Sequence, residues 1–194
     1  MRKIVYLALS ALLFMAGCSD DLALAPLDYP VQKTAPGDAL VAVIDAATQQ
    51  GIYPIKGSFT AGLRAYYAQP GVMLRQAADH DLGAMFGHYV LKDSFATPDS
   101  GQQRLTLVLE IPSFKFTDGV IDLQVDAKLF GPDRKQLLHK VYPGKGGDSQ
   151  HDFAGIGLEA VIERSSAQAY RQVFEAIRVD LAGILQRQEA LAHK

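Results

Sequence analysis

The sequence has almost no cysteine: Cys18 is the single thiol in 194 residues. A lone thiol excludes disulfides within the chain and metal sites built from several cysteines. Tryptophan is absent as well, and after residue 17 there is no apolar run of the roughly 20 residues that a membrane-spanning helix needs. A folded domain in this chain must therefore be held together by its apolar core alone.

An excess of positive charge is also lacking. The chain has 19 Lys and Arg against 21 Asp and Glu, and residues 18–194, without Arg2 and Lys3, carry a net charge of −4. A mildly acidic domain is a poor nucleic-acid binder and has no polybasic patch for lipid surfaces. We therefore expect no nucleic-acid partner.

What the chain does contain is a secretory signal at its N-terminus. Arg2 and Lys3 are followed by an apolar run over Ile4–Phe14 and by the small pair Ala16-Gly17. The apolar run is too short to cross a bilayer as a helix. A soluble secreted protein with an incidental cysteine at the cleavage site remains the alternative.

The residues Met15-Ala16-Gly17-Cys18 resemble the lipobox of bacterial lipoprotein precursors. The resemblance implies cleavage between Gly17 and Cys18 and attachment of fatty acids such as palmitate to Cys18. Such lipoproteins carry three acyl chains, which implies stable anchoring, whereas one chain binds only marginally. The resemblance also implies a location, because in many Gram-negative bacteria an Asp directly after the lipidated cysteine keeps the lipoprotein in the inner membrane. Ser19 therefore favours the periplasmic face of the outer membrane, and the nearby Asp20-Asp21 pair leaves the inner membrane as the alternative.

Three segments follow from this assignment: a signal peptide over 1–17, a lipidated N-terminus and tether over 18–38, and one periplasmic domain over 39–194. The tether contains three prolines and has no clear period. A flexible segment of that length spans roughly 25 Å. As an alternative, its apolar residues between 22 and 29 pack onto the domain.

In the first part of the domain we expect a buried strand over Ala39–Ala47, because this run is short, apolar and β-branched. A loop around Pro54 is expected over 51–57. Residues 58–68 are ambiguous and allow one or two helical turns, which Pro70-Gly71 would end. A short strand is expected over Val72–Arg75, and the role of residues 51–76 is not evident.

A helix is expected over Asp79–Phe95, because apolar residues recur there at helical spacing. Asp79 or Asp81 would cap its start. Gly83 and Gly87 lie four residues apart, on one face of such a helix, where they would let a sheet approach closely.

The clearest pattern is alternation between apolar and polar residues, which predicts strands with one buried face. It covers Arg104–Ile111 and, more strictly, Ile121–Leu129, and a third strand is expected over Gln136–Tyr142. Turn residues stand at 117–119 and 131–133. We therefore expect an antiparallel meander over 104–142.

In the C-terminal part we expect a glycine-rich loop over Pro143–Gly157 and a long amphipathic helix over Leu158–Gln188. The helix has one continuous apolar stripe: Tyr170, Val173, Phe174, Ile177, Leu181, Ile184 and Leu185. Its polar side is expected to hold Gln168, Arg171, Gln172, Glu175 and Arg178. The stripe can cover the dry face of the meander, which predicts an α+β fold, an antiparallel sheet with helices packed on one face.

The order of these features, with the opening strand Leu-Val-Ala-Val-Ile-Asp at 40–45 and the leucine-rich meander, resembles YajG-type lipoproteins. It is also similar to the auxiliary lipoproteins of intermembrane lipid transporters and to the small lipoprotein of the lipopolysaccharide export pore. The resemblance covers most of residues 39–188 and is one of pattern.

Candidate chemical sites are few. The cluster Asp79-His80-Asp81 with His88 is better explained as a helix cap than as a metal site, because the two histidines lie two helical turns apart. His151-Asp152 could belong to a hydrolase, but the sequence contains no Gly-x-Ser-x-Gly motif that would supply the serine nucleophile. Ser165 and Ser166 are expected to be ordinary polar residues of the last helix.

Two further patterns also fail as sites. Residues 144–147 (Gly-Lys-Gly-Gly) lack the ending and the setting of a phosphate-binding loop, so a solvated loop is expected. Asp122 and Asp126 lie on the wet face of one strand, about 13 Å apart, which exceeds the separation of glycosidase carboxylates. No catalytic residue, metal or cofactor is therefore expected.

These features favour a non-enzymatic, lipid-anchored accessory or assembly lipoprotein that binds a protein partner of the cell envelope. An exposed strand edge would favour binding by strand addition. A carrier of lipid or glycan, with a groove between helix and sheet, is the alternative, and an unrecognised hydrolase is a third hypothesis.

Overall fold

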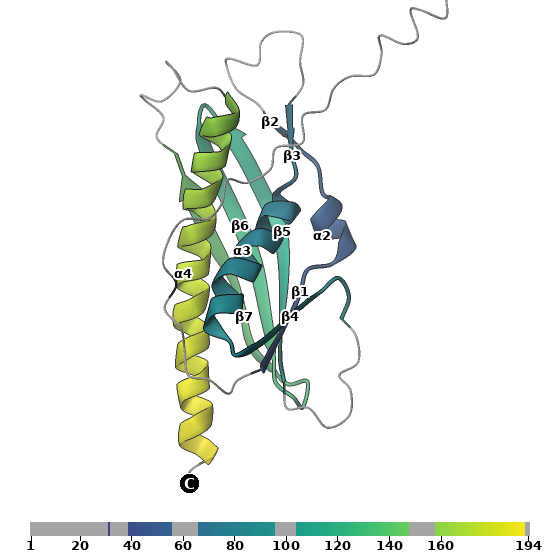
Figure 1. The fold of residues 1–194 in the computed structure, drawn as a ribbon, viewed down its shortest axis with the longest axis vertical. Coiled ribbons are helices and arrows are strands. Elements are labelled where there is room, and N and C mark those ends of the chain that lie inside the picture. The colour runs from purple at the N-terminus through teal and green to yellow at the C-terminus, as the bar shows by residue number, and fades with distance from the viewer. Residues whose placement is uncertain (1–30, 32–38, 56–65, 96–103, 148–157, 193–194) are drawn as a thin grey trace, which may run out of the picture.

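The computed structural model describes residues 31, 39–55, 66–95, 104–147 and 158–192. In these residues a five-stranded sheet is covered on one face by two helices, with a short helix and a two-stranded sheet beside them (Figure 1). The α+β class predicted from the sequence is confirmed, including the long C-terminal helix. The predicted signal peptide and tether fall outside the described residues, so the division into 1–17, 18–38 and 39–194 stays a prediction.

The main sheet has the order β4-β1-β5-β6-β7. Its strands are β1 (Ala39–Val43), β4 (His88–Lys92), β5 (Leu105–Thr117), β6 (Val120–Phe130) and β7 (Gln136–Gly146). The pairs β5–β6 and β6–β7 are antiparallel, as the meander predicted, but β1 runs parallel to both β4 and β5. The sheet is therefore mixed, because a helical crossover joins β1 to β4.

The meander is longer than the sequence alternation indicated. A two-residue turn, Asp118-Gly119, joins β5 to β6 with positive φ at both positions, 48° and 86°, as tight hairpins require. The pairing of β5 with β6 shifts between Glu110 and Ser113, where Pro112 is exposed. Before this bulge the odd-numbered residues of β5 are buried, and after it the even-numbered residues are buried. The alternation seen in the sequence therefore stops at Ile111, although the strand continues to Thr117.

The third strand continues through residues predicted to be loop. Pro143, Gly144, Lys145 and Gly146 belong to β7, and the loop prediction is wrong for them. A Cβ at Gly144 or Gly146 would overlap the backbone of the C-terminal helix, at Ala169 and Ser165 respectively. These glycines therefore let the helix pack directly on the strand, which is why a strand carries them.

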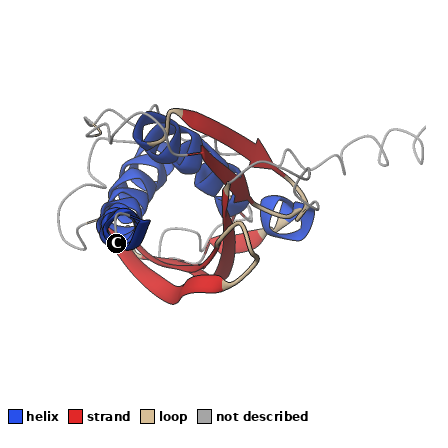
Figure 2. Ribbon diagram, turned by 90° about the horizontal axis from the view of Figure 1, so that it is seen from below, coloured by secondary structure: helices blue, strands red, loops and turns tan. Residues whose placement is uncertain are grey.

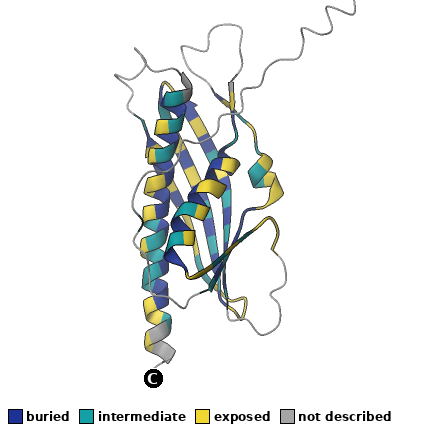
Figure 3. Ribbon diagram, in the orientation of Figure 1, coloured by how far each residue is buried: buried dark blue, intermediate teal, exposed yellow. Residues whose placement is uncertain are grey.

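The C-terminal helix α4 (Leu158–Ala192) confirms the predicted stripe, since all seven apolar residues are buried. It packs beside α3 (Pro70–Met85) on the concave face of the sheet, which curves around both helices (Figure 2). The core lies between these layers, and buried residues alternate along β5 and β6 (Figure 3).

The segment between β1 and β4 differs most from expectation. The β1 strand ends at Val43, and a short helix α2 (Ala46–Gln50) follows, capped by Asp45. The strands β2 (Tyr53–Ile55) and β3 (Tyr66–Ala68) pair where a loop and possible helical turns were expected.

The predicted strand over Val72–Arg75 is wrong, and the predicted helix over Asp79–Phe95 is wrong in its boundaries. The helix α3 begins at Pro70 and ends at Met85, so residues 72–75 are helical and Asp79 and Asp81 lie inside the helix rather than at its cap. Pro70 starts the helix instead of ending an element, because proline fits its first turn. The residues after Gly87 form β4.

The roles of the glycines in this region are also corrected. Gly87 lies outside the helix, and a Cβ at Gly83 would have room, its nearest neighbour being Tyr89 at 3.6 Å. Close approach occurs at Gly71, where a Cβ would overlap the backbone of Thr48 in α2.

Candidate functional site

The predicted lipid attachment at Cys18 and the cleavage site at Gly17 lie outside the described residues, as does the pair His151-Asp152. Within the part of the chain that the structure describes, no helix is both long and apolar enough to span a membrane.

The C-terminal half of the β7 edge of the sheet is covered by side chains of α4. Gln172 Oε1 accepts a hydrogen bond from the Lys145 N–H at 3.0 Å, and Gln168 Oε1 accepts one from the Gly147 N–H at 2.7 Å. Backbone groups of alternate residues point to the same side of a strand, so Pro143 occupies the next outward position, and proline has no N–H to offer. Half of this edge is thereby removed from strand pairing.

The opposite edge, at β4, is open among the described residues. The strand pairs with β1 on one side, and the Lys92 carbonyl accepts from the Ile44 N–H at 3.0 Å. The backbone groups of Lys92 therefore face β1, and by alternation those of Tyr89 and Leu91 face outward. Val90 is 42% exposed, and the lysine that could discourage pairing stands only at the end of the strand.

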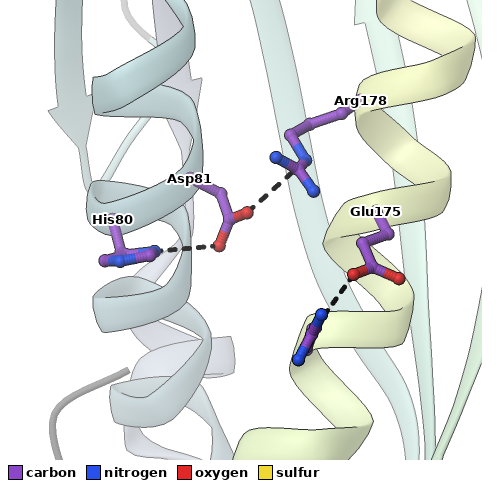
Figure 4. Close-up of polar contacts among 5 residues, drawn as sticks. His80, Asp81, Glu175 and Arg178 are labelled. Carbon is purple, nitrogen blue, oxygen red and sulfur yellow. Dashed lines mark hydrogen bonds and ion pairs between the residues drawn. The ribbon is translucent and has the colours of Figure 1, made fainter. Parts of the chain in front are cut away.

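Asp81 and Arg178 meet at the interface of α3 and α4. Asp81 is fully buried; its Oδ1 lies 3.6 Å from Arg178 Nε, and its Oδ2 lies 3.4 Å from His80 Nδ1 (Figure 4). Arg178 was expected on the polar side of α4, but its side chain is only 19% exposed. This ion pair links α3 to α4 in the interior of the domain.

His80 and His88 do not share a helix. His80 lies in α3, whereas His88 begins β4 and is exposed. Among the described residues, no group of three or more His, Cys, Asp or Glu side chains could hold a metal ion.

A second polar contact joins β7 to α4. Tyr142 Oη and Lys140 Nζ both donate to Asp180 Oδ2, each at 2.7 Å. These two hydrogen bonds, that of Lys140 first, lower the pKa of Asp180 below its ordinary value of 3.8. Burial and the Asp180 carboxylate together raise the pKa of the Tyr142 hydroxyl, so it stays protonated and donates.

The convex face of the sheet carries a chain of ion pairs. Lys128 Nζ lies 2.8 Å from Glu110 Oε2 and 3.2 Å from Asp126 Oδ2, and His139 Nε2 lies 3.0 Å from Asp126 Oδ1. The hydrogen bond to Glu110, and then that to Asp126, raises the pKa of Lys128. Asp126 is thus held by basic neighbours, while Asp122 is exposed further along β6, an arrangement typical of a solvated face.

The serines of α4 prove to be structural. Ser165 Oγ donates to the Gly119 carbonyl at 2.8 Å, which ties the β5–β6 turn to the helix. Ser166 is buried as well. This burial could not be predicted from the sequence, because two adjacent serines near the start of a helix are typical of a solvent-facing position.

Comparison with known proteins gives no sequence-level family. No family model matches the chain, and no curated protein matches it. The predicted resemblance to YajG-type and transport-associated lipoproteins therefore stays a prediction.

Several solved structures are similar in fold. They include protein XCC0632 from Xanthomonas campestris, described with the family model DUF330 (13% identity, 84% of this chain and 99% of that chain, TM-score 0.46). A second is the hypothetical protein CT253 from Chlamydia trachomatis (10% identity, 76% of this chain and 98% of that chain, TM-score 0.47). A third is a protein from Caulobacter crescentus that is provisionally described as a lipoprotein (16% identity, 66% of this chain and 91% of that chain, TM-score 0.32). With TM-scores below 0.5, these likenesses carry no functional argument.

Proposed function

We propose that this protein is a non-enzymatic accessory lipoprotein of the cell envelope, anchored through Cys18, that binds a protein partner by strand addition along β4. We infer the lipid anchor from the lipobox at 15–18, and we propose the outer membrane as its location because of Ser19. The observation that carries the binding mode is the contrast between the two sheet edges.

The contrast has a physical meaning. An unpaired edge is a template for another strand, and proteins usually protect such edges. This domain protects the C-terminal half of the β7 edge with two glutamines and a proline, while Tyr89 and Leu91 present outward backbone groups on β4. Main-chain hydrogen bonds would supply affinity for an added strand, and Val90 would contact its side chains.

The interior favours a binding protein over a carrier with a groove between helix and sheet. The stripe of α4 and the inward residues of β5 and β6 are buried against one another. Among the described residues, this interface is therefore filled by side chains rather than left open for a ligand.

The anchor is tested by mass spectrometry of the purified mature protein and by fractionation of a Cys18→Ser variant. We expect acyl chains on Cys18, and release of the variant into the periplasmic fraction. An unmodified N-terminus, or a variant that remains with the membrane after a high-salt wash, would contradict the anchor.

The binding mode is tested with a photo-crosslinking amino acid at Val90 on β4 and, as the matched control, at Val179 on α4. Both valines are exposed, 42% and 72% respectively. We expect an adduct of defined mass from position 90, weakened by Leu91→Pro, which removes one outward N–H. Equal adducts from both positions, or an adduct that Leu91→Pro leaves unchanged in a folded variant, would contradict strand addition.

A further inference from the structure

A cavity of about 220 Å³ opens at the end of the sheet where β4, β1 and β5 begin. It is lined by Leu40, Gly87, His88, Tyr89, Val90 and Arg104. Two of these six residues, Arg104 and His88, have side chains that can carry positive charge. A cavity of this size is too small for a large organic ligand and fits a compact group such as a phosphate.

The sheet register places the two basic side chains on one row. His88 pairs with Ala39, and Leu40 pairs with Leu105, which puts Arg104 in line with Ala39. Residues in line on parallel strands share a face, so His88 and Arg104 flank the methyl group of Ala39. Their backbones stand two strand spacings apart, roughly 10 Å, which leaves a gap that one anionic group can bridge.

These two basic groups are not used elsewhere in the described structure. Neither Arg104 nor His88 has an ion-pair or hydrogen-bond partner among the described residues, whereas Lys128, Lys140 and Arg178 all have carboxylate partners. An unpaired guanidinium beside a cavity offers its full set of donors to an incoming anion, and its planar fork matches phosphate oxygens.

The neighbouring row on the same face is mostly apolar. It runs from Val90 through Val41 and Thr106 to Phe130. The exposed ring of Phe95 stacks edge-on against Phe130, with ring centroids 5.7 Å apart. A ligand held by its anionic group at Arg104 would thus have apolar surface beside it.

From these observations we infer that Arg104 and His88 form a binding site for a phosphate ester, with Arg104 as the principal contact and the Val90 row receiving the organic part. The source of the phosphate can be a lipid headgroup or a soluble ester. If the anchor proposed above is present, Ala39 follows a tether that reaches roughly 25 Å, so the site can meet headgroups of the same bilayer.

The test uses residues 18–194 with Cys18→Ser, which keeps the whole mature chain without acyl groups. Calorimetry measures binding of sn-glycerol 3-phosphate and inorganic phosphate. Sedimentation measures binding to phosphatidylcholine vesicles with and without phosphatidylglycerol. Three folded variants are compared by thermal denaturation and then by binding: Arg104→Gln, His88→Gln and, as the matched loss of one positive charge, Lys115→Gln, which is exposed on β5.

We expect saturable binding that Arg104→Gln weakens about tenfold or more, because charged hydrogen bonds are the strong ones. His88→Gln should weaken it by a smaller factor, and Lys115→Gln should leave it unchanged. Binding to the soluble ester alone assigns the site to a free phosphate compound. Vesicle binding with the same dependence on Arg104 assigns it to a headgroup.

The inference is overturned if no probe binds saturably, if Arg104→Gln binds as the parent does, or if Lys115→Gln loses as much affinity as Arg104→Gln. Neither the acyl chains nor a protein partner takes part in this measurement. Its failure therefore leaves the proposed function standing, and failure of the crosslinking at Val90 leaves the phosphate site standing.

Discussion

Gly146 of β7 lies so close to Ser165 of α4 that a methyl group on the glycine would overlap the serine carbonyl oxygen. The contact is between backbones, which cannot rotate away as a side chain can. It fixes how near the long helix approaches the sheet and hence how tightly the apolar stripe of α4 is packed.

The first prediction compares two glycine substitutions. Gly146→Ala should lower the free energy of unfolding by about 3 kcal/mol, because the strand or the helix must shift. Gly183→Ala is the matched control: Gly183 lies within α4 with open space around a Cβ, so alanine should raise stability by about 0.5–1 kcal/mol. Urea unfolding measures both. A Gly146→Ala protein as stable as the parent would show that α4 does not pack this closely.

The second prediction concerns the protected edge. Replacing Gln168 and Gln172 by alanine uncovers the N–H groups of Gly147 and Lys145. The double variant should associate with rising concentration, since an uncovered edge recruits other strands. Sedimentation velocity measures this, with Gln186→Ala, an exposed glutamine of the same helix, as the control. A double variant that stays as monodisperse as Gln186→Ala would rule out edge protection as the role of these side chains.

The third prediction concerns the buried pair. Arg178→Met removes the guanidinium that faces the fully buried Asp81 carboxylate and should cost about 3 kcal/mol of stability. Adding Asp81→Leu should restore part of that loss, because two apolar residues can fill the same space. Arg171→Met, which breaks the exposed pair with Glu175 on the same helix, should cost less than about 1 kcal/mol. A double-mutant cycle in urea gives the coupling, and additive losses would show that Asp81 and Arg178 do not interact.

The elements that could be predicted from the sequence are those whose pattern of apolar residues indicates one buried face. The strands around Leu107 and Val125 follow from period-two alternation, and α4 follows from its stripe. Gly144, Gly146 and Pro70 were misjudged because their roles depend on partners distant in the chain. A glycine within a strand can be explained only when a helix is known to pack directly against it. The local sequence does not show that contact.

The strand β4 was misjudged for a different reason. Tyr89 and Val90 continue the helical spacing of Leu82 and Met85, so periodicity alone cannot separate them. The helix ends at Met85, and the chain then pairs in parallel with β1, 49 residues earlier. The alignment of His88 with Arg104 depends on that non-local register, so neither the open edge nor the phosphate site could be found from the sequence.

The last prediction is a dependence on pH at Asp180. Its pKa is lowered in the folded protein, chiefly by the hydrogen bond from Lys140 and then by that from Tyr142. A lowered folded pKa means that the carboxylate stabilises the fold above its ordinary pKa of 3.8, and that this contribution disappears as the pH falls through the folded value. Asp180→Asn should therefore be less stable than the parent near neutral pH, and the difference should shrink below about pH 4.

The size of that difference is limited because the Asp180 side chain is 30% exposed, so we expect no more than about 1 kcal/mol. Urea unfolding at about pH 6 and about pH 3 measures it, with Asp122→Asn, an exposed aspartate of β6, as the control. Lys140→Met should remove most of the pH-dependent part, because Lys140 is the larger cause of the shift, while Tyr142→Phe should remove less of it. A gap between parent and Asp180→Asn that stays constant down to pH 3 would mean that the carboxylate is not held by these two donors.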